Sequence, residues 1–333
     1  MKVTRDQILA FRRRAGGLDE RLPRSAASLR RAAWAGLQDS MPRAAVLSLH
    51  ARVRDVPPAI LDDRALAQLW GPRFSVYVVA ARDFAIFSLG RYPEGAKARE
   101  RAEREAARVR EALRGGRATH DELGARLGVN PNMLKYGAAT GTIAIRWEGA
   151  RSPLVWNVER PAIDPAEARR ELARRHLHVF GPTTAAHFAV WAGVKLPAAT
   201  ATYASLEREL LPVRTPLGDE LILAADEEAV RAGDPAPAPA RLLPSGDAYY
   251  LLQGAERALL VPDASQRARL WTTRVWPGAL LVDGELRGTW RRDRHVVRVE
   301  PWSRLDAGRR AAVEAEAATL PLPLERAVEV RWE

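Results

Sequence analysis

The 333-residue chain contains no cysteine, which excludes disulfides, thiolate catalysis and Cys-ligated metal centres. It also lacks a long apolar run, because the longest one, Phe74 to Ala81, is too short to cross a bilayer. The N-terminus has no apolar core of a signal peptide, and no glycine-rich phosphate loop or nucleophile elbow is present. We therefore expect a cytoplasmic globular protein that makes no contact with membranes.

Lysine is scarce: four lysines stand beside 48 arginines, and the formal net charge is +11. The excess is uneven, since residues 1–60 carry 12 basic and 5 acidic groups, whereas residues 151–240 carry 10 and 12. A local positive excess is typical of proteins that bind phosphate polyanions. Arginine in place of lysine, with abundant alanine, is equally typical of proteins from GC-rich genomes. The charge alone leaves both interpretations open.

Metal-binding patterns are also lacking. The chain has six histidines, and only His176 and His178 lie close in sequence. Residues two apart on a helix point in different directions, so this pair makes a poor metal site. We expect neither a metal nor an organic cofactor.

Helix and strand patterns recur in a similar order three times. Residues 1–93 contain helical patterns at 4–14 and 25–37, a third helical candidate at Asp62 to Trp70, and a strand pattern from Phe74 to Val79. Residues 94–160 begin with a long charged helix from Glu94 to Arg114. A capping box at Thr119 to Glu122, a helix start at Asn130 and Pro131, and strands at 142–147 and 154–158 follow. This order is typical of a winged helix-turn-helix.

A third copy covers residues 161–233, with helices at 165–180, 183–191 and 197–211 and a hairpin at 213–225. Residues 234–240 alternate proline and alanine and predict a stiff linker. In the last domain, residues 241–333, we expect short strands at 248–253, 258–261, 279–282, 289–291 and 296–299, a helix at 306–320 and a strand at 327–332. The predicted fold is α+β: three tandem winged helix-turn-helix units followed by a small C-terminal β-barrel or curled sheet.

Five stretches, taken in order, resemble the winged-helix DNA-binding family that includes the AlkZ/YcaQ-type DNA glycosylases. They are Gly36-Leu37-Gln38 with Pro42 and residues 49–53, Leu69 to Tyr77 with Asp83, Phe180 to Gly193, Leu242-Leu243-Pro244, and Val282 to Arg291. The resemblance covers nearly the whole chain. It implies three tandem winged helices, a C-terminal β-barrel and the removal of bulky alkylated bases or the unhooking of interstrand crosslinks.

The family's catalytic signature is Gln-x-Gln or Gln-x-Asp, and the corresponding residues here are Gln38, Asp39 and Ser40. Hydrolysis of an N-glycosidic bond passes through a sugar with oxocarbenium character, so the site needs a group that orients or deprotonates water. Ser40 in the second position is a poor base, and the carboxylate of Asp39 is the one acidic group between Glu20 and Asp55. Two interpretations stay open: these residues are catalytic, or Gln38 and Asp39 brace the turn that ends at Pro42.

The resemblance implies duplex DNA, including damaged duplex, as the partner. We expect the basic face of residues 1–150 to line a channel in a C-shaped molecule, with Arg12 among its residues. The candidate DNA-binding residues are Arg43, Arg52, Arg73, Tyr77, Lys135, Tyr136 and Arg146. Two functions remain open: a monofunctional DNA glycosylase that acts on bulky or cationic alkylated purines, and a non-catalytic DNA-binding protein with a degenerate signature. On DNA the protein would be nucleoid-associated, and protein partners are not predicted.

Overall fold

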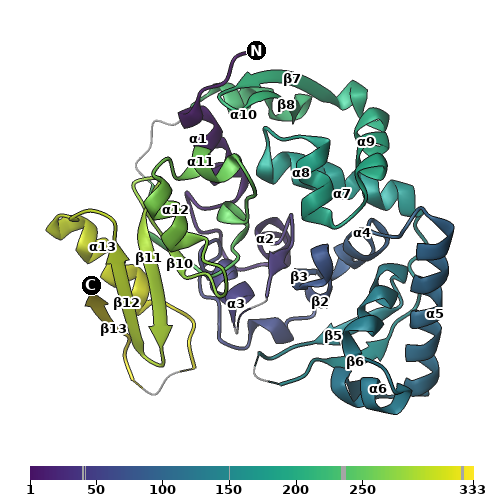
Figure 1. The fold of residues 1–333 in the computed structure, drawn as a ribbon. Helices are drawn as coiled ribbons and strands as arrows, with labels where there is room; N and C mark the ends of the chain where they lie inside the picture. The colour runs from purple at the N-terminus through teal and green to yellow at the C-terminus, as the bar shows by residue number, and fades with distance from the viewer. Residues whose placement is uncertain (40, 42, 150, 234–237, 324–325) are drawn as a thin grey trace.

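The computed structural model describes residues 1–333 except 40, 42, 150, 234–237 and 324–325. The N-terminal segment lies at the centre of the molecule, with the C-terminal sheet on one side and the two middle segments on the other (Figure 1). Among the described residues, no helix is both long enough and apolar enough to span a bilayer.

The N-terminal segment supplies helices and half of the largest sheet. Its elements are α1 (Arg5–Ala15), α2 (Ala26–Ala32), β1 (Leu37–Gln38), α3 (Ala44–His50), β2 (Leu66–Trp70), β3 (Val76–Ala80) and α4 (Phe84–Leu89). The helix predicted from Asp62 to Trp70 is wrong, because this stretch contains strand β2. β2 pairs with a strand on each side and four of its five residues are buried, so its apolar run does not alternate as an edge strand would.

The second segment follows the predicted order closely. Its elements are α5 (Ala96–Leu113), β4 (Arg117–Thr119), α6 (His120–Leu127), the 3₁₀ helix η4 (Pro131–Thr140), β5 (Ile143–Arg146) and β6 (Leu154–Asn157). The capping box of Thr119 and Glu122 is present, and Asn130 caps the helix that starts at Pro131. The predicted helix boundaries and the hairpin are confirmed here.

One six-stranded sheet joins the first two segments, in the order β1-β3-β2-β5-β6-β4. The junction is narrow, because β2 and β5 pair in register only at Gln68 and Ile145. The sequence predicted one strand stretch in the first segment and a hairpin in the second, and it gave no sign that they share a sheet. Three independent winged-helix units therefore stay a prediction.

The third segment packs against α1 and α4. Its elements are α7 (Pro165–Phe180), α8 (Ala185–Ala192), α9 (Leu196–Ser205), the hairpin of β7 (Leu210–Thr215) and β8 (Gly218–Leu223), and α10 (Glu227–Arg231). The sequence predicted that Thr183 caps α8, and this was wrong by one residue. The capping residue is Thr184, whose side chain accepts a hydrogen bond from the backbone N–H of His187. Thr183 instead pairs through its backbone with Leu221 in β8.

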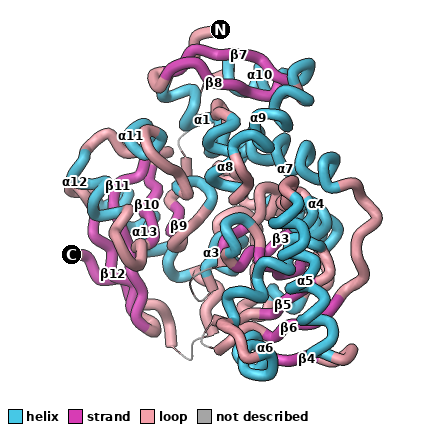
Figure 2. Tube along the Cα trace, turned by 45° about the vertical axis from the view of Figure 1, so that its right-hand side comes forward, coloured by secondary structure: helices cyan, strands magenta, loops and turns pink. Residues whose placement is uncertain are grey.

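The C-terminal segment forms an open sheet beside three helices (Figure 2). Its elements are β9 (Arg241–Leu243), α11 (Glu256–Leu260), α12 (Ala264–Leu270), β10 (Gly278–Val282), β11 (Glu285–Asp293), β12 (Val296–Pro301), α13 (Ala307–Ala318) and β13 (Glu329–Trp332). The strand order β13-β12-β11-β10-β9 leaves β13 and β9 at opposite edges, so the sheet is not closed into a barrel. The strands predicted at 248–253 and 258–261 were wrong: the first contains a 3₁₀ turn, Ala248–Tyr250, and the second overlaps α11. Both are short apolar runs, in which length and hydrophobicity do not separate helix from strand.

Candidate active site

The signature segment, which we define as residues 36–42, contains the edge strand β1 of the six-stranded sheet. β1 pairs antiparallel with β3, with Leu37 opposite Val78 and Gln38 opposite Tyr77, and the N–H of Asp39 donates to the carbonyl of Val76 at 2.8 Å. Successive side chains of a strand point to opposite faces. Gln38 and Asp39 therefore enter different surroundings. Ser40 and Pro42 lie outside the described residues.

The amide of Gln38 has a fixed orientation. The guanidinium Nη2 of Arg73 donates a hydrogen bond to Gln38 Oε1 at 2.9 Å. Arginine only donates, so the contacted atom must be the amide oxygen. On the other side the amide lies close to the backbone of Gly246, where an added Cβ would stand 3.1 Å from Nε2. Nε2 makes no hydrogen bond with the described residues, so its two N–H groups can bind a ligand.

Arg73 reaches Gln38 from a constrained turn. Arg73 and Phe74 both adopt left-handed backbone conformations, with φ of 54° and 58°, which side chains with a Cβ rarely adopt. Gly193, which follows α8, packs closely against this turn. A Cβ at Gly193 would lie 3.1 Å from the backbone nitrogen of Arg73. Such paired outliers are found where the surrounding structure fixes a functional side chain.

A second arginine, Arg257, interacts electrostatically with Arg73. The pKa of Arg257 is lowered, first by burial and then by the charge of Arg73. Arg257 also covers the rings of Trp271 and Trp276, at 5.1 and 5.2 Å from their centroids. Among the described residues, neither Arg73 nor Arg257 forms an ion pair with a carboxylate. Arg73, which contacts Gln38, and Arg257 thus carry charges that a phosphate could compensate.

The loop at Gly246 is anchored by a buried ion pair. Arg52 donates from Nη1 and Nη2 to the two carboxylate oxygens of Asp247, each at 2.8 Å, and Ser48 Oγ donates to Oδ2 at 2.6 Å. Burial would raise the pKa of Asp247, but the charge and hydrogen bonds of Arg52 and the hydrogen bond of Ser48 lower it overall. Arg52 was a candidate DNA-binding residue, and the structure places its guanidinium inside the protein.

Asp39 points to the opposite face and is 2% exposed. Its Oδ1 accepts from the backbone N–H of Ala45 in α3 at 3.0 Å, and its Oδ2 accepts from Gln68 Nε2 at 3.1 Å. Burial raises the pKa of Asp39 to about 6, although the Ala45 hydrogen bond and the charge of Arg146 oppose this shift. These contacts fit the bracing role that the sequence left open.

Gln68 extends this bracing to the second segment. Its Oε1 accepts from the N–H of Trp147 at 2.6 Å, and its Nε2 approaches the carbonyl of Trp147 at 3.3 Å. Gln68 therefore links Asp39 to the end of β5, at the residue where β2 and β5 meet. A single polar residue within the apolar stretch Leu66–Trp70 was the available sequence signal, and the sequence analysis did not use it.

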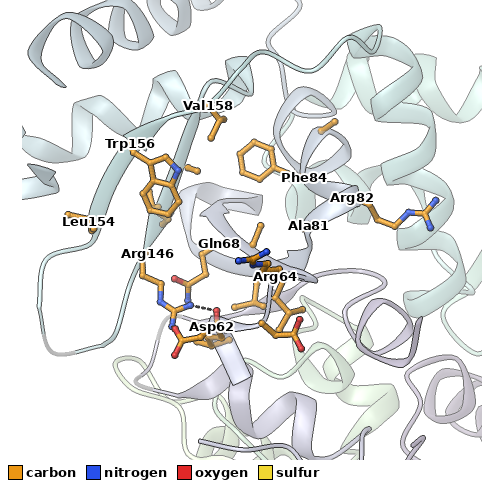
Figure 3. A pocket seen from close by; sticks show the side chains of 18 of the residues that line it. Asp62, Arg64, Gln68, Ala81, Arg82, Phe84, Arg146, Leu154, Trp156 and Val158 are labelled. Atoms are coloured by element: carbon orange, nitrogen blue, oxygen red, sulfur yellow. Dashed lines mark hydrogen bonds and ion pairs between the residues drawn. The ribbon is translucent and has the colours of Figure 1, made fainter. Parts of the chain in front are cut away.

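Two adjoining cavities lie on the Asp39 face. The smaller, about 380 Å³, is lined by Asp39 and Arg43, and the larger is about 880 Å³. Arg146 lines both, and its guanidinium donates to Asp62 and to the carbonyl of Leu61. Figure 3 shows Arg146 directed at Asp62, with Trp156 and Phe84 on the walls of the larger cavity. The larger cavity is lined by apolar side chains and by charged side chains of both signs.

The remaining DNA-binding candidates occupy different environments. Arg43 is half-buried and donates to the carbonyl of Pro58 at 3.1 Å. Tyr77 is buried in β3, and glycines 36 and 71 lie close to its side chain. Lys135 is half-buried, and burial lowers its pKa. Tyr136 lies under the guanidinium of Arg101, 3.6 Å from the ring centroid, and contacts Phe74 edge to face.

These positions correct the electrostatic argument for one basic face. Arg12 is 3% exposed and donates to Glu256 and to the carbonyls of residues 181 and 182, and Arg52 is 2% exposed. Part of the excess positive charge of residues 1–60 is therefore neutralised by ion pairs inside the protein. The positive charge that contacts Gln38 comes from Arg73, which lies outside residues 1–60.

The two histidines of the pair lie in different environments. His176 is buried among aromatic rings, whereas the side chain of His178 contacts Asp226 at 2.9 Å. Within the described part of the chain, no three His, Asp or Glu side chains are arranged as metal ligands.

Comparison with known proteins supports the fold over the full length. DNA glycosylase AlkZ of Streptomyces sahachiroi superposes with a TM-score of 0.80 at 19% sequence identity, covering 100% of each chain. Residues 31–321 match the family described as DNA glycosylase AlkZ-like. The chain belongs to this AlkZ-like DNA glycosylase family, as its five sequence motifs indicated. No curated protein matches its sequence.

Proposed function

We propose that this protein hydrolyses the N-glycosidic bond of bulky or cationic alkylated purines in duplex DNA. The observation that carries the proposal is the Gln38 amide, whose oxygen accepts a hydrogen bond from Arg73 at 2.9 Å. Arg73 would orient the amide, and Gln38 would contact the reacting nucleotide or its water. Arg257, which interacts electrostatically with Arg73 and has no carboxylate partner among the described residues, would hold a DNA phosphate. The family membership supports the same reaction class.

A cationic leaving group explains why a neutral amide suffices. In a purine alkylated at N7 or N3, the electron pair of the C1′–N bond passes to the base and neutralises its charge, so no acid is needed. The sugar becomes oxocarbenium-like, and the oxygen of a water molecule bonds to C1′ while the proton passes to solvent. Oε1 of Gln38 has a second lone pair that can accept a hydrogen bond from this water, while Nε2 donates to an oxygen of the DNA.

The two neighbours of Gln38 in the signature have different proposed roles. Ser40 occupies the second signature position and offers a hydroxyl that can orient water, but it is a poor base. The carboxylate of Asp39 binds Ala45 and Gln68 on the opposite face, so we assign it a bracing role and no proton transfer.

The placement of Asp39 also favours a second candidate function, a DNA-binding protein without catalysis, because the carboxylate of the signature is bound to Ala45 and Gln68 and is turned away from Gln38. Base release separates the two. Duplexes that carry N7-methylguanine, a bulky N7-alkylguanine or the neutral base uracil are incubated with the protein, and free bases are separated by chromatography. We expect release of both cationic bases and none of uracil. DNA binding without release of any base would establish the second candidate.

A further inference from the structure

A cavity on the far side of the Arg73 turn belongs to neither face of the signature segment. It has a volume of about 420 Å³, within the ~300–1,000 Å³ range of small-molecule sites. Its walls come from the turn at Phe74, the segment after α4, the start of α5, helix η4 and the connection between α8 and α9.

The cavity has an aromatic wall. Phe74 and Tyr136 contact each other edge to face, with ring centroids 5.0 Å apart. The guanidinium of Arg91 lies 4.8 Å from the Phe74 ring centroid, and that of Arg101 lies over Tyr136. Aromatic rings and guanidinium planes are the surfaces on which proteins stack nucleobases.

The cavity also has an excess of positive charge. Four cationic side chains line it, Arg91, Arg101, Arg169 and Lys195, against one carboxylate, Glu94, which pairs with Arg169. Within the described chain, the other three cations have no carboxylate partner. An anion would supply the missing charge.

Arg91 is the strongest evidence that the cavity binds an anion. It is 5% exposed, and its Nε and Nη1 donate to the carbonyls of Ala192 and Trp70 at 3.0 and 2.8 Å. Burial lowers its pKa to about 10, so it stays charged at neutral pH. A buried charge without a counter-ion is costly, and such a group at a cavity wall favours a negatively charged ligand. Lys195 is exposed and adds a second cation without steric obstruction.

We propose that this cavity binds a nucleoside phosphate, with the base against Phe74, Tyr136 and Arg101 and the phosphate toward Arg91 and Lys195. The ligand can be a free nucleotide or an unpaired nucleotide of a DNA strand, because both present a flat base and a phosphate. The site is separate from Gln38, since Phe74 and Arg73 leave the same turn toward different partners. Nucleotide binding here does not depend on base release.

The test is a fluorescence titration of the full chain with 2-aminopurine deoxyriboside 5′-monophosphate. A second titration uses a DNA duplex with one unpaired 2-aminopurine. Stacking quenches this base, so binding lowers its fluorescence. Quenching of the free nucleotide identifies a mononucleotide site, and quenching confined to the duplex identifies a DNA strand as the source.

Two variants and a control locate the site. Lys195→Glu reverses an exposed charge and should weaken binding about tenfold, equivalent to about 1.4 kcal/mol. Ala98→Trp fills the cavity from α5 and should abolish quenching. Lys97→Glu makes the same charge change on an exposed residue outside the cavity and should bind like the wild type. Absence of quenching in both titrations, or equal quenching by the wild type and Lys195→Glu, would overturn the proposal even where base release is normal.

Discussion

Gln38 and Asp39 are neighbours in sequence, yet they belong to two different environments. Gln38 meets a guanidinium and a glycine backbone, and its Nε2 makes no hydrogen bond with the described chain. Asp39 is enclosed and both of its oxygens accept hydrogen bonds from the protein. The strand alternation separates a side chain that can bind a ligand from one that holds the protein together.

The difference between the surroundings of Gln38 and Asp39 shows that an acidic residue in a catalytic motif is not necessarily a general base. A general base must reach the proton that it removes. Asp39 has a pKa of about 6, which alone would suit a base, but burial causes this shift and its partners lie in α3 and β2. The geometry therefore outweighs the pKa in assigning its role.

The largest expected effect concerns the buried ion pair of Arg52 and Asp247, which anchors the loop next to Gln38. Arg52→Ala should destabilise the protein by about 3–5 kcal/mol, because it leaves the buried carboxylate of Asp247 without its counter-ion. Denaturant unfolding measures this loss. Arg54→Ala removes an exposed pair with Glu20 and should cost at most about 1 kcal/mol. Equal losses in the two variants would show that the Arg52–Asp247 pair does not anchor the loop.

The second prediction concerns the Asp39 face and pH. The pKa of Asp39 is raised to about 6 in the folded protein, so the folded state binds this proton more tightly than the unfolded state. The contribution of Asp39 to stability is therefore greatest below pH 4 and falls as the pH rises to about 6. A shift of about two pKa units corresponds to a loss of up to about 3 kcal/mol.

Urea unfolding at pH 4, 5, 6 and 7 checks the effect of Asp39. Asp39→Asn should remove this part of the pH dependence, whereas Asp6→Asn, at a side chain that is 89% exposed, should keep the wild-type profile. A profile for Asp39→Asn that parallels the wild type between pH 4 and 6 would contradict the buried placement.

The third prediction compares the two faces in catalysis. Gln38→Ala should lower base release about 10- to 100-fold without changing stability, since one orienting hydrogen bond contributes about 1–3 kcal/mol. Single-turnover release from N7-methylguanine DNA measures it, and Gln266→Ala in α12 is the matched control. An Asp39→Asn loss larger than that of Gln38→Ala, at equal folded fraction, would reverse the assignment of the two residues.

Local sequence patterns predicted many of the elements. The capping box at Thr119, the proline at the start of η4 and the glycine after α8 each act within a few residues, so their effect can be read from the chain. The failures share a cause. The strand β2 and the helix α11 are buried apolar stretches whose type depends on the neighbours they pack against.

The sequence identified Gln38 as a candidate site residue, but it could not identify the residues that contact Gln38. Arg73 and Gly246 reach Gln38 only through the fold. Nothing in the sequence distinguishes Arg52 from the other arginines, because its partner Asp247 lies 195 positions away. The prediction of one basic face, which was based on counting charges, failed for the same reason. A composition does not distinguish an arginine inside an ion pair from one that faces a ligand.

The smallest expected effect tests how Arg73 acts. Arg73→Ala should lower base release about tenfold, because a hydrogen bond from a charged donor contributes about 1.5 kcal/mol and fixes the Gln38 amide. If Arg73 acts through Gln38, the double variant with Gln38→Ala should be no slower than Gln38→Ala alone. Single-turnover rates of the four proteins form the complete cycle.

Arg257→Ala is the control for a contact with phosphate alone, because Arg257 lies near Arg73 and makes no hydrogen bond with Gln38 in the described chain. Its effect should add to that of Gln38→Ala, and it should reduce the salt dependence of DNA affinity by about one phosphate contact. Additive losses for Arg73 and Gln38, with the same change in salt dependence as Arg257→Ala, would mean that Arg73 binds DNA directly. Non-additive losses would instead show that Arg73 positions the amide, and Arg73 and Arg257 would then have different roles.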